Sequence, residues 1–333
     1  MQKFIDQQRI KYNLKGLIIS VNDKTYVSGN SMTTELVNPD MHFNIGGQGI
    51  TVLTTLFLIL VEQGYLRLST KIGKYLPKVP NGDQITLWML CNMTFGLPDL
   101  PINPGDDVFR QWTSQELLEI VYQMNPIFEP GTKFLFSHLT AMLLLGTVLN
   151  TAMNCSLEFL LKTYIFEPLR LSETRYTLEQ DIKSPILHAF ANIRVKDYEE
   201  STFWNDSWTS YAACLQSTSK DLIKIARNLG SGQLLSQKYY RIQMSNSSND
   251  DLEYYGMGCA IGGFGLDYLK STKYPYPIIW TSQDIAGYAG IWAYIPSQKL
   301  AIQIQTNTYN GDGFSVNMIL SNMIKSFGVE KIG

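Results

Sequence analysis

The sequence has few of the residues that metal sites and disulfide frameworks need. Its 333 residues include only four cysteines and three histidines. The cysteines stand tens of residues apart, at Cys91, Cys155, Cys214 and Cys259, with no Cys-x-x-Cys pair. Structural zinc requires clustered thiolate or imidazole ligands. We therefore expect free thiols, no metal and no other cofactor.

Strong charge of one sign is also absent. The 27 Lys and Arg residues nearly balance the 29 Asp and Glu residues, which gives a net charge of −2. A nucleic-acid partner would need a basic surface that neutralises phosphates. The balanced charge therefore argues against nucleic acid as a partner.

No apolar run is as long as a membrane span, which takes about 20 residues. The longest run, residues 52–61, is apolar in nearly every direction of a helix, a pattern typical of a helix buried on all sides. Residues 1–8 lack the apolar centre of a secretory signal. We expect no transmembrane segment, and a cytoplasmic protein if Met1 is the native start or an extracytoplasmic one if the N-terminus has been trimmed.

What is present indicates a folded chain with two lobes. Hydrophobic residues make up 45% of the sequence and charged residues 17%, which excludes a disordered chain. Strand patterns occur near both ends, at residues 16–21 and 25–27 around an Asn22-Asp23 turn, and at residues 291–295 and 300–305. Both ends of the chain therefore contribute to one antiparallel sheet.

Helical patterns dominate the middle of the chain. Thr113 to Glu116 is typical of a capping box, and residues 140–149 form a strongly apolar helix. We predict an α+β fold in which an antiparallel sheet is flanked by helices and lies beside an all-helical lobe. Residues 1–70 and 236–333 would form the discontinuous α/β lobe and residues 71–235 the helical lobe, with the site in the cleft between them.

Several short motifs follow one another in a fixed order. They are Phe43-Asn44-Ile45-Gly46, Gly64-Tyr65-Leu66, Thr94-Phe95-Gly96-Leu97-Pro98, Pro130-Gly131-Thr132, Ser217-Thr218 and Tyr255-Gly256-Met257-Gly258. In this order they resemble the serine β-lactamase and penicillin-binding-protein superfamily, above all its class C β-lactamase and D-alanyl-D-alanine carboxypeptidase branch. The resemblance implies the same two-lobed fold and a serine-hydrolase ancestry.

The resemblance also assigns three catalytic elements, and this sequence departs from each. A nucleophilic Ser and a Lys one helical turn later fall on Gly47 and Ile50. The Tyr-x-Asn element falls on Phe136-Ser137-His138, so the phenolic oxygen is absent and His138 replaces an amide. The Lys-Thr-Gly or His-x-Gly element falls on Thr281-Ser282-Gln283, which has no cation.

Loss of the nucleophile alone costs serine hydrolases about a millionfold in turnover. We therefore expect a catalytically inactive relative, a pseudoenzyme that serves as a ligand-binding or protein-interaction module. The alternative is a serine-hydrolase-type esterase or peptidase with a rearranged active site. A Ser-x-x-Lys motif does occur at Ser217 to Lys220, but there it predicts the start of a helix capped by Thr218 or Ser217.

Binding could survive without the catalytic side chains. A helix N-terminus attracts anions through its backbone N–H groups, and a glycine at position 47 lets a ligand approach them. We expect a small anionic or peptide-like ligand, bound by these groups with His138, Thr281, Ser282 and Gln283. In the opposing interpretation Ile50 and Phe136 fill the vacated space, and the protein acts through its outer surface on an unknown protein partner.

Overall fold

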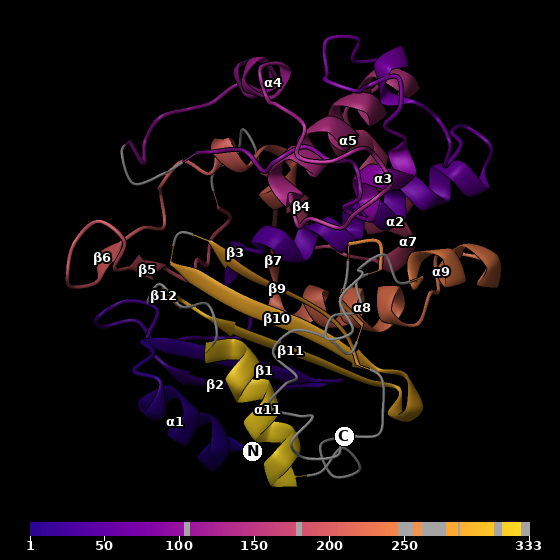
Figure 1. The fold of residues 1–333 in the computed structure, drawn as a ribbon. Coiled ribbons are helices and arrows are strands. Elements are labelled where there is room, and N and C mark those ends of the chain that lie inside the picture. Colours follow the sequence, from indigo (N-terminus) through magenta and orange to yellow (C-terminus); the bar gives the residue numbers. More distant parts are fainter. Residues whose placement is uncertain are drawn as a thin grey trace.

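The computed structural model describes residues 1–102, 107–177, 182–245, 256–258, 260–261, 278–285, 287–309 and 315–327. Figure 1 shows a sheet with helices on both faces below a region made mostly of helices. Cys259 and Tyr255 lie outside the described residues. Cys91, Cys155 and Cys214 are free thiols, as predicted.

A six-stranded sheet forms the centre of the described structure, and all its pairings are antiparallel. Its strands in spatial order are β2 (Lys24–Gly29), β1 (Gly16–Val21), β11 (Leu300–Thr306), β10 (Tyr288–Ile295), β9 (Ile279–Ile285) and β8 (Ala260–Ile261). Asn22 turns between β1 and β2 with φ 48°, a conformation that asparagine tolerates better than most residues. The 3₁₀ turn η5 (Pro296–Gln298) joins β10 to β11, so the predicted N-terminal turn and the two predicted C-terminal strands are confirmed.

Helices cover the two faces of this sheet. α1 (Gln2–Lys11) and α11 (Ser315–Phe327) share one apolar core with residues of β1, β10 and β11. α8 (Ser219–Gly230) contacts β11 and β10 from the other face (Figure 1). The predicted α+β fold, with an antiparallel sheet flanked by helices, is confirmed. The lobe boundaries at residues 70 and 235 stay a prediction.

The mostly helical region is built around α2 (Gly49–Glu62), whose residues are buried from Gly49 to Val61. The other helical elements of this region are η2 (Ile72–Lys74), α3 (Leu87–Cys91), α4 (Ser114–Tyr122), α5 (His138–Met153), α6 (Leu157–Leu161), the π-helical turn η3 (Lys162–Phe166), α7 (Glu167–Leu169) and α9 (Gln237–Gln243). Thr113 and Glu116 make the predicted capping box. Among described residues no single helix has the length and apolarity of a membrane span; only α5 with the helical run 157–169 meets both criteria, across an 86° bend.

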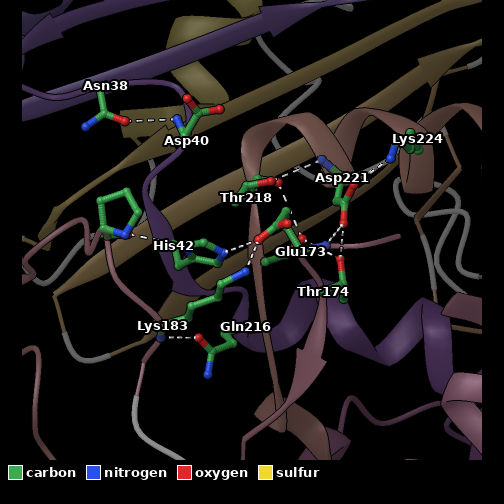
Figure 2. A network of polar contacts seen from close by, with 12 residues as sticks. Asn38, Asp40, His42, Glu173, Thr174, Lys183, Gln216, Thr218, Asp221 and Lys224 are labelled. Carbon is green, nitrogen blue, oxygen red and sulfur yellow. Dashed lines mark hydrogen bonds and ion pairs between the residues drawn. The ribbon is translucent and has the colours of Figure 1, made fainter. Parts of the chain in front are cut away.

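Two small sheets and the 3₁₀-helical segment η4 (Ser207–Ala213) complete the described fold. One consists of β3 (His42–Asn44), β7 (Leu215–Thr218) and β4 (Arg175–Tyr176), and the other of β12 (Thr308–Tyr309), β5 (Phe190–Ala191) and β6 (Glu199–Glu200). Figure 2 shows the polar contacts beside the first sheet, where Glu173 lies between His42 and Lys183. Because His42 Nε2 is 3.0 Å from Glu173 Oε2 and the ring is buried, we assign His42 a structural role.

Candidate functional site

The chain between β3 and α2 forms a tight 3₁₀ turn, η1 (Gly46–Gln48). Asn44 shapes the entrance: its Oδ1 accepts a hydrogen bond of 2.7 Å from the Gly46 N–H. Gly46 has φ +45°, a left-handed conformation that glycine adopts without strain. Asn44 and Gly46 together therefore shape the turn that carries Gly47 and leads into α2.

Gly47 lies between β9 and the first turn of α2. A Cβ atom added to Gly47 would lie 3.3 Å from the Ser282 carbonyl oxygen and 3.7 Å from Ile50 Cδ1. Gly47 is partly exposed, whereas Ile50 is buried with 4% of its surface accessible. The structure thus brings three predicted site residues together, and at their meeting point it presents backbone and hydrocarbon.

Gln283 packs under this turn from β9. Its side chain is buried, and its Nε2 donates a 3.0 Å hydrogen bond to the Asn44 carbonyl oxygen. Its Oε1 occupies the space where a Gly46 side chain would be. Thr281, two residues earlier on the same face of β9, is also buried. Gln283 therefore acts as a support for the turn.

Further buried amides lie under the turn. The side chains of Gln48 and Gln305 fill the space beside Gly290, which pairs with Gln283 across β9 and β10. Gln48 is fully buried, and neither polar atom of its amide has a hydrogen-bond partner among the described residues. A buried amide without a hydrogen-bond partner lowers the free energy of unfolding, so the Gln48 side chain destabilises the fold.

A buried acid is linked to the turn through Asn44. Asn44 Nδ2 donates a 2.9 Å hydrogen bond to Asp206 Oδ2. Although part of Asp206 reaches solvent, its Oδ1 is buried and has no hydrogen-bond partner within the described residues. Burial raises the pKa of Asp206 to about 7, and the bond from Asn44 lowers it in part. Burial raises the pKa of Tyr288, and the negative charge of Asp206 raises it further.

The second predicted element stands at the N-terminus of α5. The rings of Phe136 and His138 stack, with centroids 4.9 Å apart and planes at 21°. His138 Nδ1 lies 3.2 Å from Asp99 Oδ2, which is an ion-pair distance without the alignment of a hydrogen bond. Asp99 Oδ1 accepts a 2.9 Å hydrogen bond from the Thr140 N–H, so one carboxylate caps α5 and faces the imidazole.

Asp99 was not among the predicted site residues. The feature of the sequence that could have pointed to Asp99 is its position directly after the Thr94 to Pro98 motif. Ser137, the neighbour of His138, is fully buried, and its hydroxyl donates to the Leu97 carbonyl oxygen.

The interpretation in which two side chains fill the vacated space is wrong for one of them. Ile50 packs inward, but Phe136 is 50% exposed. A phenyl ring stacked on a partly exposed imidazole gains apolar contact without leaving the surface. Phe136 therefore lines the outside of the site instead of filling it.

The remaining sequence candidates have structural roles. Thr218 is the N-cap of α8 and accepts a hydrogen bond from the Asp221 N–H, whereas Lys220 is exposed. The Ser-x-x-Lys motif at Ser217 to Lys220 is thus the start of helix α8, as predicted. Within the described ranges no group of three or more His, Cys, Asp or Glu side chains could hold a metal ion.

Comparison with known proteins gives one family. The Beta-lactamase family model matches residues 1–319. Penicillin-binding protein 4* of Bacillus subtilis (strain 168) is 30% identical over 126 residues, a match covering 35% of this chain and only 27% of that protein.

Solved structures share the fold at low identity. D-amino acid amidase from Ochrobactrum anthropi SV3, complexed with L-phenylalanine amide, has a TM-score of 0.82 at 20% identity, covering 96% of this chain and 94% of that one. The octameric penicillin-binding protein homologue from Pyrococcus abyssi has a TM-score of 0.80 at 18% identity, and the match covers 97% of this chain and 76% of that one.

Proposed function

The chain belongs to the β-lactamase family, and on that premise we propose that it is a catalytically inactive member that binds a small anionic or peptide-like ligand at the η1 turn. The observation that carries the proposal is the environment of Gly47. Where the family chemistry needs a hydroxyl and an amine, Gly47 and Ile50 offer neither, and the nearest atom to a side chain at position 47 would be a carbonyl oxygen.

Backbone donors support binding. Gly47 is partly exposed, and within the described part of the chain no acceptor bonds to its N–H. The turn leads directly into α2, whose N-terminal end carries partial positive charge. An anion placed here would meet a free donor and a favourable dipole.

His138 is the side chain best suited to help. Its Nε2 has no hydrogen bond to a described residue, and Asp99 faces its other ring nitrogen. A carboxylate beside an imidazole fixes the orientation of the ring. We infer that His138 offers an N–H to the ligand.

The test separates chemistry from binding. The protein is incubated with a fluorescent penicillin and with a fluorophosphonate, and nitrocefin and p-nitrophenyl ester turnover is followed. We expect no covalent label and no turnover. Titration calorimetry with N-acetyl-D-alanine should give saturable heat, and Gly47→Leu, which fills the turn, should abolish it. Asp83→Asn, at an exposed position, is the matched control.

One observation favours the alternative, a hydrolase with a rearranged site. The Asp99 and His138 pair has the components of a general base. Covalent labelling that is lost in His138→Ala would establish this alternative and end the proposal of inactivity.

A further inference from the structure

A groove is lined by residues separate from the η1 turn. The helical run from α6 through η3 to α7 and the strand β4 enclose a groove of about 490 Å³. Ligand sites in proteins fall mostly between about 300 and 1,000 Å³. None of the residues lining the groove belongs to the proposed β-lactamase-type site.

Charged side chains line the groove, and none of them has an ion-pair partner within the described ranges. Lys162, Arg170 and Arg175 contribute three cations, and Glu158 and Glu167 two carboxylates. No ion pair joins any of the five to a described residue. The groove therefore has an excess of one positive charge that the described fold does not use.

An apolar surface lies beside these charges. Phe166 and Leu171 line the groove and are buried, and Tyr176 is half-buried. Both Lys162 and Phe166 belong to the π-helical turn η3, and such turns occur frequently at functional sites. Arg170 ends α7 in the left-handed conformation, with φ 54°, which is unusual for a residue other than glycine.

We propose that this groove binds a small organic anion, in which a carboxylate or phosphate group meets the arginines and an attached apolar group lies against Phe166 and Leu171. Arginine suits both anions because its planar guanidinium makes paired hydrogen bonds. The proposal is independent of the function assigned to the η1 turn.

The probes are benzoate and phenyl phosphate, titrated calorimetrically into the whole protein, with benzyl alcohol and inorganic phosphate as partial ligands. We expect the two aromatic anions to bind more tightly than either partial ligand, and their relative affinity identifies the preferred anion. Arg175→Gln should weaken binding about tenfold, the effect of losing one charge-assisted contact. Arg67→Gln, at an exposed arginine outside the groove, should leave affinity unchanged.

Glu167→Gln provides a change of opposite sign. It removes a repelling carboxylate and should tighten anion binding about threefold, which a folding defect would not do. Equal affinity for benzyl alcohol and benzoate would overturn the proposal. So would unchanged affinity in Arg175→Gln, with or without a loss of binding in Gly47→Leu.

Discussion

Replacement of Asp206 by asparagine tests the buried acid behind the η1 turn. Asn44 Nδ2 donates to Asp206 Oδ2, and an asparagine oxygen accepts the same bond. The substitution therefore keeps shape and hydrogen bonding while removing the ability to ionise. Any change in the pH dependence of stability then reports the charge alone.

The magnitude follows from the pKa of Asp206. In the folded state burial raises this pKa from 3.8 to about 7. The folded protein thus holds a proton that the unfolded chain has already released, so wild-type stability falls as pH rises from about 4 to about 7. About two pH units of this interval lie above pH 5, and over each of them the wild-type free energy of unfolding falls by about 1.4 kcal/mol. Between pH 5 and pH 8, Asp206→Asn should gain about 2.5 kcal/mol relative to wild type.

The assay is urea denaturation of both proteins at pH 5, 6, 7 and 8. Because other titrating groups are common to the two proteins, they cancel in the difference between the unfolding free energies. Asp83→Asn, at an exposed position, should follow the wild-type curve. A constant difference between wild type and Asp206→Asn across this range would refute the assignment of a buried carboxyl group with a raised pKa.

Three further predictions concern stability. Leu56→Ala in α2, at a fully buried position, should cost about 2–5 kcal/mol in urea denaturation because it leaves a cavity; a loss below about 1 kcal/mol would contradict the packing. Thr113→Ala removes the cap that bonds to the Glu116 N–H and should cost about 1 kcal/mol, with Gln115→Ala as the control. The pKa of Glu173 is lowered by its bonds to Lys183 first and His42 second, so its stabilisation is present at neutral pH and lost as pH falls through its folded-state pKa. Glu173→Gln should therefore flatten the thermal-stability profile between pH 5 and pH 3, and an unchanged profile would contradict this.

Local sequence patterns predicted the elements well. The Asn22 turn, the capping box at Thr113 and the helix start at Thr218 all depend on residues within three positions of one another. The buried helix α2 was evident because its apolar residues leave no polar face. Such features need no knowledge of tertiary contacts.

The polar surroundings of the site could not be predicted in this way. The contacts from Asp99 to His138, from Gln283 to Asn44 and from Asn44 to Asp206 each join residues far apart in sequence. No local pattern distinguishes these side chains from exposed ones, since their burial results from packing of separate elements. The opposing interpretation placed Phe136 in the vacated space, whereas in the structure it is half exposed.

Intact-protein mass spectrometry after incubation with a penicillin and a fluorophosphonate tests the central claim most directly. With Gly47 and Ile50 at the positions of nucleophile and amine, the account predicts the unmodified mass, while an active penicillin-binding protein in the same reaction gains the mass of the acyl group. A stoichiometric adduct that maps to β9, the η1 turn or the start of α5 would contradict it.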